Sequence, residues 1–261
     1  MENYASSKMQ EWGIFVQPLL IDKDEVKELR DCINNEITKV ETLTQLHHPN
    51  IKIGQDIISF KEISSRGNER FDLLLQPTTK AADFVNNVLI ERVKLILQRL
   101  LNGKVEEDVD FDVSVVYSKP NAPDQGWHAD GDHQNGTHDV GLEIDGFKNL
   151  AEPYALCLFI PLIDLDEDTG YTQFWPGSHI SKRLAGFGKV AEITQSTWEG
   201  KHKAGDAIWY DYRLMHRGIR NTSTMLRPVL QVLFKKKWYK EKRNYGKDSV
   251  LPTNDCNKNE D

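Results

Sequence analysis

The sequence predicts a mainly β fold with flanking N-terminal helices, in the form of a β-sandwich or jelly roll. Apolar residues recur at helical spacing before about residue 105, whereas short alternating or continuous apolar segments follow it. Clusters of Gly, Asn, Ser, Thr and Pro separate these later segments, as turns separate strands. We therefore expect a single domain over residues 1–243, with 1–105 as helical support and 106–240 as the jelly-roll core. The polar segment 244–261 has few core-forming residues, so we expect a loose tail there.

Two helices are expected in the N-terminal part. Residues 22–40 carry apolar side chains at helical spacing, and Asp22 followed three residues later by Glu25 resembles a capping box. Residues 79–101 carry a broader apolar face with the same periodicity. The mixed and polar residues 41–78 between them predict no element.

Five strands are expected after residue 105. Residues 109–117 alternate between apolar and polar side chains, and residues 154–162 form a continuous apolar run of strand length. The further candidates are residues 171–175, 206–212 and 226–234. Because both faces of the last strand are largely apolar, the sheet needs cover on each side. A second sheet would cover one face, and the N-terminal helices would cover the other.

Composition argues against several classes of function. The chain has 261 residues and a formal net charge of −7, whereas nucleic-acid binding needs a basic surface. The basic cluster at 235–243 is interpreted as a solvated strand exit rather than a polyanion site. No apolar run reaches the roughly 18 residues that a membrane span needs. Three cysteines without paired spacing suit a reducing compartment, so a cytosolic protein is expected.

The first candidate metal ligands are His128 and Asp130. On an extended segment, residues two apart point to the same side, so both side chains can bind one ion. An imidazole and a carboxylate form a mixed nitrogen and oxygen donor set that suits iron(II). By themselves the two residues are equally consistent with a solvent-exposed loop. Asp132, His133 and His138 follow closely, and a zinc site built from several of these residues is the alternative.

The second group of candidates lies near the end of the chain. A strand leads to His216, and a polar turn then precedes the strand that contains Arg227. Because neighbouring strands lie about 4.8 Å apart, an antiparallel return can set Arg227 beside the segment that leads into His216. A buried arginine keeps its charge, and a ligand carboxylate is a suitable bidentate partner. An internal salt bridge with Asp206 or Asp211 is an equally weighted alternative.

These residues together suggest one kind of metal centre. His128, Asp130 and His216 would occupy one face of an octahedral iron, as in the facial triad of non-haem oxygenases. The opposite face would stay open for a bidentate 2-oxo acid and for dioxygen. Arg227 at the far end of the pocket would bind the second carboxylate of a five-carbon dicarboxylate.

The order of three motifs resembles the phytanoyl-CoA dioxygenase family. The motifs are WHAD at 127–130, GYTQFWPGSH at 170–179 and GDAIWYDYRLMHRG at 205–218, with Arg227 eleven residues after His216. The resemblance covers about residues 109–240 and, more faintly, the N-terminal helices. It implies a double-stranded β-helix, which is a cupin-like jelly roll, and an enzyme that uses iron(II), 2-oxoglutarate and dioxygen.

The resemblance also implies roles for individual residues. The iron ligands would be His128, Asp130 and His216, and Arg227 would bind the 5-carboxylate of 2-oxoglutarate. The residues expected elsewhere in the co-substrate pocket are Tyr117 or Lys119, as contacts, and Phe159, as a wall. Halogenating relatives lack the carboxylate ligand. Its presence here favours hydroxylation, or a related outcome such as desaturation, of a small organic metabolite, with release of succinate and carbon dioxide.

The long connection at residues 131–153 departs from the family's pattern. Connections of this length are often lids, so we interpret His133 and His138 as surface or lid residues rather than ligands. A substrate lid would hold Trp127, Phe147 and His133 near the site.

Two other classes of function compete with the oxygenase. One is a binding-only jelly roll with a structural metal or an inactive site, and the other is a zinc- or manganese-dependent cupin-like enzyme. Nothing in the sequence marks a coenzyme A site, a peptide groove or a sugar platform, and nothing indicates the oligomeric state. Arg66 and Arg70 are candidates to face an anionic substrate, although surface salt bridges are the favoured interpretation.

Overall fold

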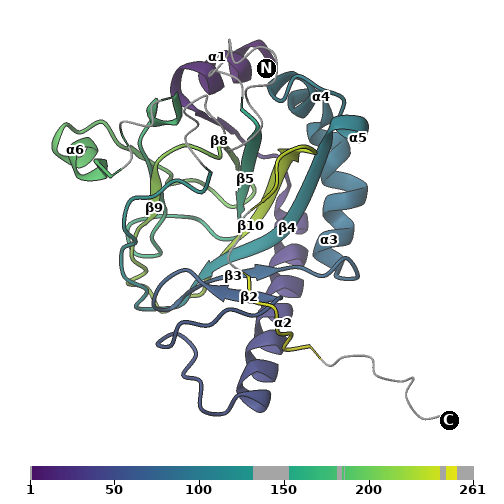
Figure 1. Cartoon of the computed structure of the whole chain (residues 1–261), viewed down its shortest axis with the longest axis vertical. Coiled ribbons are helices and arrows are strands. Elements are labelled where there is room, and N and C mark those ends of the chain that lie inside the picture. The colour runs from purple at the N-terminus through teal and green to yellow at the C-terminus, as the bar shows by residue number, and fades with distance from the viewer. Residues whose placement is uncertain (1, 132–152, 181–183, 185, 242–244, 252–261) are drawn as a thin grey trace.

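Two antiparallel β-sheets form the centre of the structure, a computed structural model that describes residues 2–131, 153–180, 184, 186–241 and 245–251. The larger sheet has the strand order β1-β8-β5-β10-β4-β3-β2, and the smaller sheet has the order β7-β6-β9. Helices lie along one side of the larger sheet, and the smaller sheet lies on its other side (Figure 1). This arrangement confirms the predicted jelly roll with flanking helices.

The strands follow one another along the chain as short segments. They are β1 (Ile14–Gln17), β2 (Ile63–Ser65), β3 (Arg70–Leu74), β4 (Val109–Ser118), β5 (Ala155–Pro161), β6 (Thr172–Phe174), β7 (Trp198–Glu199), β8 (Ala207–Asp211), β9 (His216–Gly218) and β10 (Arg227–Lys236). The expected strands at 109–117, 154–162, 171–175, 206–212 and 226–234 correspond to β4, β5, β6, β8 and β10.

Most helices lie in the N-terminal half of the chain. They are α1 (Glu2–Trp12), α2 (Lys23–His47), α3 (Lys80–Phe84), the π-helical turn η1 (Val85–Leu89), α4 (Ile90–Leu100), α5 (Val105–Asp108), the 3-10 turn η2 (Ser178–Ile180) and α6 (Gly188–Ile193). The capping box predicted for α2 is present, because Asp22 accepts from the Glu25 N–H and Glu25 accepts from the Asp22 N–H. The helix expected at 79–101 is the continuous run of α3, η1 and α4. Among the described helices, none is both long enough and apolar enough to cross a membrane.

Side chains alternate along each strand, so one face of the larger sheet packs against the helices and the other faces a cavity. Val115, Leu230 and Ile160 pair across β4, β10 and β5, and all three are fully buried. They belong to the same apolar cluster as the buried face of α2. The alternate residues on these strands, among them Val229 and Gln231, face a cavity on the side of the smaller sheet. The helices therefore support the sheet from behind, and the cavity lies in front of it.

The first 105 residues contribute strands as well as helices, which the sequence analysis did not anticipate. β1 pairs with β8 at one edge of the larger sheet, and β3 pairs with β4 near the other. These strands and β2 have only three to five residues each. Such short segments carry little periodic signal, and β1 and β3 pair with residues 40 or more positions away in the chain.

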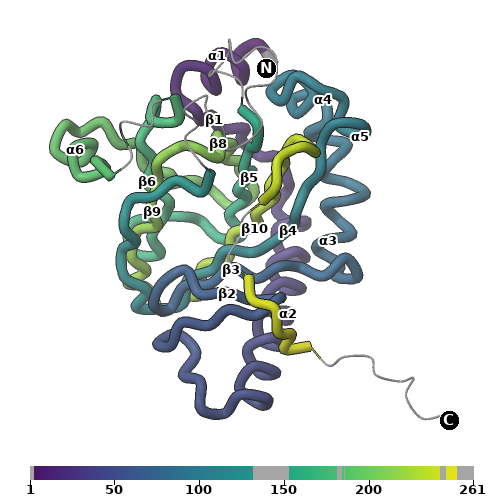
Figure 2. The backbone as a smooth tube through the Cα atoms, in the orientation of Figure 1, coloured from purple at the N-terminus to yellow at the C-terminus, as the bar shows by residue number. Residues whose placement is uncertain are grey.

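The expectation of a loose tail from residue 244 is wrong for residues 245–251. Val250 is fully buried, and its N–H donates to a carboxylate oxygen of Glu62. The backbone of the same segment also bonds to Phe60 and Lys61. One apolar side chain and a few backbone hydrogen bonds are enough to hold this segment beside β2 (Figure 2). The remaining expected tail, 252–261, lies outside the described residues.

The packing of α4 predicts a large difference between two leucines on the same helix. Leu97 is fully buried in the main apolar cluster, whereas Leu95 is 65% exposed. Leu97→Ala should lower the free energy of unfolding by about 2–5 kcal/mol, and Leu95→Ala should change it by less than about 0.5 kcal/mol. Urea denaturation of both variants measures the difference. Equal losses would contradict the orientation of α4.

Candidate metal centre

Two segments that are distant in the sequence meet at His128 and His216. The two residues form an antiparallel bridge, in which the His128 N–H donates to the His216 carbonyl at 3.0 Å and the His216 N–H donates back at 2.7 Å. A further backbone bond joins Gly131 to Tyr212. His216 begins β9, and His128 lies on the loop that follows β4. Directly paired residues of an antiparallel bridge point to the same side, so both imidazoles face the cavity.

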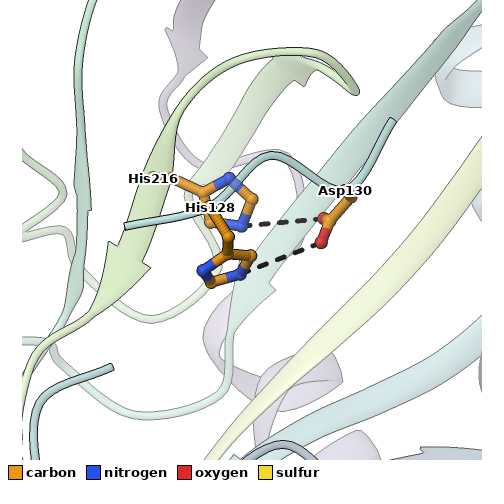
Figure 3. A group of neighbouring side chains, drawn as sticks. All are labelled: His128, Asp130 and His216. Carbon is orange, nitrogen blue, oxygen red and sulfur yellow. Dashed lines mark ion pairs between the residues drawn. The ribbon is translucent and has the colours of Figure 1, made fainter. Parts of the chain in front are cut away.

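Asp130 completes a compact group with the two histidines (Figure 3). Its two carboxylate oxygens lie 3.9 Å from the His128 Nε2 and 3.6 Å from the His216 Nε2. One potential ligand atom from each of the three side chains lies within 4.8 Å of the others. Ligand atoms about 2.1 Å from one ion lie about 3 Å apart when they are at right angles. The observed spacing is therefore close to that of a metal site.

Hydrogen bonds orient both imidazole rings. The His128 Nδ1 bonds to the Gly126 carbonyl at 2.9 Å, and the His216 Nδ1 bonds to the Leu214 carbonyl at 2.9 Å. A carbonyl oxygen only accepts, so each Nδ1 carries the proton and each Nε2 keeps a lone pair. Bonds of this kind fix the tautomer and the ring orientation of histidines that bind metals. The two nitrogens and one carboxylate oxygen form the donor set of a facial triad.

Burial keeps His216 neutral. The pKa of His216 is lowered to about 4, chiefly by desolvation; the charge of Asp130 acts in the opposite direction, and His128 adds to the lowering. At neutral pH the His216 imidazole is therefore available as a ligand without first losing a proton.

The cavity in front of the three side chains has a volume of about 320 Å³. It is lined by Arg66, Arg70, Asp72, Val116, Gln125, His128, Ala129, Asp130, Phe159, Thr172, Tyr212, His216, Gly218, Arg227, Val229, Gln231, Tyr239 and Glu241. Pockets for small molecules usually have volumes from about 300 to 1,000 Å³. The cavity thus suits a small ligand and contains several charged groups.

Arg227, the first residue of β10, lies buried in this cavity with 4% of its surface exposed. Its guanidinium donates to the carbonyls of Ile219 at 3.1 Å and Thr169 at 3.4 Å, and no carboxylate among the described residues pairs with it. Burial, and then the charge of Arg70, hold the pKa of Arg227 well below its ordinary value. The guanidinium therefore has donors to offer an anionic ligand.

The alternative salt bridges of Arg227 are not formed. Asp211 accepts from the Arg213 guanidinium at 2.8 and 2.7 Å, and this ion pair is buried. Asp206 accepts from the Leu19 N–H and lies 3.4 Å from His202. Both candidate partners are therefore engaged elsewhere.

Arg70 is a second buried cation in the cavity, which sequence reasoning undervalued. It is 1% exposed and donates to the carbonyls of Pro123 at 3.0 Å and Ile219 at 3.2 Å. Burial lowers its pKa to about 10. Arg70 and Arg227 share the Ile219 carbonyl as acceptor, and both pair with Ser118 across β4. The alternation of polar and apolar residues in RFDLL (70–74) was the available signal.

Arg66 forms a salt bridge, but this pair lies in the cavity with a buried carboxylate, whereas the sequence favoured a salt bridge on the surface. Its guanidinium donates to Asp72 at 3.1 Å, and both residues line the cavity. Arg70 lies two residues before Asp72 on the same face of β3, but it has no carboxylate within salt-bridge distance among the described residues.

Phe159 lies in the cavity wall, and its ring packs edge-on against Tyr210 at 5.0 Å between centroids. Tyr117 and Lys119 do not line the cavity. The Tyr117 hydroxyl and the Lys119 ammonium each donate to Glu41 of α2 at 2.9 Å. The cause is the alternation of side chains along β4, because Val116 faces the cavity and Tyr117 faces the helices.

The lid and the zinc alternative concern residues outside the described part of the chain. Asp132, His133, His138 and Phe147 all fall there. Trp127 is described, and its indole N–H donates to Glu192 of α6 at 2.8 Å rather than facing the cavity.

Comparison with known proteins gives one family and several similar structures. The model of the family described as phytanoyl-CoA dioxygenase (PhyH) matches residues 9–229. Among solved structures, the α-ketoglutarate (2-oxoglutarate) dependent epimerase SnoN from nogalamycin biosynthesis is 15% identical with a TM-score of 0.60, and the match covers 90% of this chain and 80% of that chain.

Two further structures show the same likeness. The α-ketoglutarate dependent carbocyclase SnoK, also from nogalamycin biosynthesis, is 16% identical with a TM-score of 0.60, and the match covers 90% of this chain and 84% of that chain. EvdO2 from Micromonospora carbonacea var. aurantiaca, complexed with 2-oxoglutarate, is 14% identical with a TM-score of 0.58, and the match covers 90% of this chain and 91% of that chain. At these identities the structural likeness shows the fold.

The neutral state of His216 predicts how the stability of the metal-free protein depends on pH. The unfolded chain binds a proton at this histidine below about pH 6.5, whereas the folded chain does so only near pH 4. The free energy of unfolding should therefore fall as pH decreases from 6.5 to 4, by about 3 kcal/mol from this residue. Urea titrations of metal-free protein at several pH values should show that the free energy of unfolding falls less steeply with decreasing pH in His216→Gln than in wild type. The exposed His47→Gln should retain the wild-type slope, and a wild-type slope in His216→Gln would contradict the assignment.

Proposed function

This chain belongs to the phytanoyl-CoA dioxygenase family, and on that premise we propose that it oxidises a C–H bond of a small organic molecule, with hydroxylation as the expected outcome. The reaction would consume 2-oxoglutarate and dioxygen and release succinate and carbon dioxide. One observation carries the proposal: a single cavity is lined both by the group of His128, Asp130 and His216 and by the buried cation Arg227.

Iron(II) is the metal that family membership implies, and the three clustered side chains suit it. His128 and His216 would each donate the Nε2 lone pair, because the Nδ1 of each ring is held by a backbone carbonyl. Asp130 would add one negative charge and an oxygen ligand. When bound, iron(II) supplies the activation of dioxygen that is coupled to oxidative decarboxylation of 2-oxoglutarate.

The buried arginines would bind and orient the co-substrate. The distal carboxylate of 2-oxoglutarate can accept several hydrogen bonds, so both Arg227 and Arg70 can donate to it. The Ser118 hydroxyl lies in the same cross-strand row, is buried and has no hydrogen-bond partner among the described residues. An anion here would neutralise part of the positive charge of Arg70 and Arg227, which burial makes energetically unfavourable. Its 2-oxo acid end would then extend toward the metal ligands.

The remaining walls of the cavity favour a small substrate. Val116, Phe159 and Val229 supply an apolar surface that excludes water beside the metal ligands. With 2-oxoglutarate inside, a volume of about 320 Å³ leaves room for only a small organic group near the metal.

Asp130 supports hydroxylation or desaturation over halogenation, because its carboxylate would fill the coordination position that a halide needs. SnoN and SnoK are described as an epimerase and a carbocyclase, so other outcomes of C–H oxidation occur on this fold. A zinc- or manganese-dependent cupin-like enzyme is the alternative in which the three ligands are kept and 2-oxoglutarate plays no part.

The first test is the formation of the complex itself. Anaerobic addition of iron(II) and 2-oxoglutarate to the wild-type protein should give a weak visible charge-transfer band, and His216→Ala should abolish it. In air, the wild-type complex should form succinate slowly, and small organic metabolites can then be screened for stimulation. A wild-type protein that gives neither the band nor succinate would contradict the oxygenase.

The second test compares two arginines. Arg227→Ala should raise the Kd for 2-oxoglutarate by the equivalent of about 2–5 kcal/mol, because it truncates one partner of a buried charge pair. Arg220→Ala is the matched control, because Arg220 is mostly exposed and pairs with Asp124 outside the cavity. Titration of the visible band measures both values. Equal affinity in wild type and Arg227→Ala would contradict the role of Arg227 in binding 2-oxoglutarate.

A further inference from the structure

We propose that Glu192 of α6 is a positioning residue for the metal centre, which acts through the residues adjacent to both histidine ligands. This inference rests on the metal centre of the proposed function. It concerns a part of the molecule that faces away from the cavity, namely the side of the His128–His216 bridge that α6 covers.

The geometry of the bridge sends alternate side chains to opposite sides. His128 and His216 face the cavity, so their neighbours Trp127 and Arg217 face outward. These two outward side chains contact each other, with the Arg217 guanidinium 5.1 Å from the centroid of the Trp127 ring. Trp127 directly precedes one ligand histidine, and Arg217 directly follows the other.

Glu192 joins both members of the outer pair through one oxygen atom. Its Oε1 accepts from the Trp127 indole N–H at 2.8 Å and lies 3.2 Å from the Arg217 Nη1. The hydrogen bond from Trp127 is the largest cause that lowers the pKa of Glu192, and the charge of Arg217 lowers it further. Glu192 is thus an anion at neutral pH and adds a charged contact between two segments that also meet through backbone hydrogen bonds and through the Trp127–Arg217 contact.

The packing of α6 leaves little room for this contact to shift. A side chain at Gly188, the first residue of α6, would overlap the Trp127 ring, so the helix backbone lies directly on the indole. Ala191 packs in a cluster with Met215, against which Trp127 and Ala129 also lie. Met215 directly precedes one ligand histidine, and Ala129 separates His128 from Asp130. The helix therefore backs both ligand-bearing segments, and Glu192 supplies its polar contact.

The consequence for the metal is a matter of orientation. The carbonyls that orient the imidazoles belong to Gly126 and Leu214, which lie in the same two segments that Glu192 joins. Ligand atoms must stay within about 0.5 Å of the productive geometry to bind well. Removal of groups that orient metal ligands typically weakens metal binding by about 10- to 100-fold. Because Glu192 acts one residue further out, we expect the lower end of that range.

Cobalt(II) binding tests the inference without any turnover. Titration of metal-free protein with cobalt(II) alone gives a Kd and a visible spectrum that reports ligand geometry. Glu192→Ala should raise this Kd about tenfold and alter the spectrum. Glu192→Gln keeps an acceptor for the Trp127 N–H and should recover part of the loss. Glu106→Ala is the matched control, because Glu106 forms an ion pair with Lys94 away from the cavity. This variant should bind cobalt(II) with the wild-type Kd.

The possible outcomes distinguish an effect of Glu192 on metal binding from an effect on protein stability alone. A Glu192→Ala protein that melts at a lower temperature but binds cobalt(II) with the wild-type Kd and spectrum would overturn the inference. If Glu192→Ala does not fold, Trp127→Phe removes the indole donor while it keeps an aromatic ring, and this variant must show the same direction of change. A wild-type protein that binds no cobalt(II) would overturn the metal centre itself, whereas wild-type binding with unchanged variants would overturn only the role of Glu192.

Discussion

Two backbone hydrogen bonds between His128 and His216 are the constraint on which the candidate centre depends. They join a loop after β4 to the start of β9 and set both imidazoles on the same side. Every other feature of the centre follows from this contact, because Asp130 lies two residues beyond one histidine and α6 covers the reverse side. Amide groups of the main chain carry no information about residue type, so a site of this kind is fixed by topology and then completed by side chains.

The larger sheet serves this centre by separating charge from apolar packing. The residues that face the helices are almost entirely apolar, with the Tyr117–Glu41 hydrogen bond as a polar exception. The residues that face the cavity include Arg70 and Arg227, each held by backbone carbonyls. Carbonyl oxygens are neutral, so a guanidinium bonded only to them keeps a positive charge that these acceptors do not neutralise. Such a guanidinium can bind an anionic ligand. The alternation of a β-strand thus allows one layer of backbone to support a core and a polar pocket.

Much of the architecture could be predicted from local patterns. The capping box of α2 and the alternation in β4 are signals contained within one segment, and both predictions are confirmed. The three clustered side chains were found through motif order. Arg70 was undervalued because its burial depends on β3 pairing with β4, and a five-residue strand carries too weak a signal to predict that pairing. The side of β4 on which Tyr117 lies was predicted wrongly, because a sequence shows that side chains alternate but does not show which set faces a cavity.

The position of β10 in the larger sheet has a consequence for synthesis of the protein. β10 is the last in sequence order of the strands that the structure describes, yet it lies at the centre of the sheet and pairs with β4 on one side and β5 on the other. Until it emerges from the ribosome, both of these neighbours present unpaired edges, and no strand connects the two halves of the sheet. A nascent chain without residues 227–236 therefore cannot complete the larger sheet, and assembly of the sheet must wait until this strand has been made.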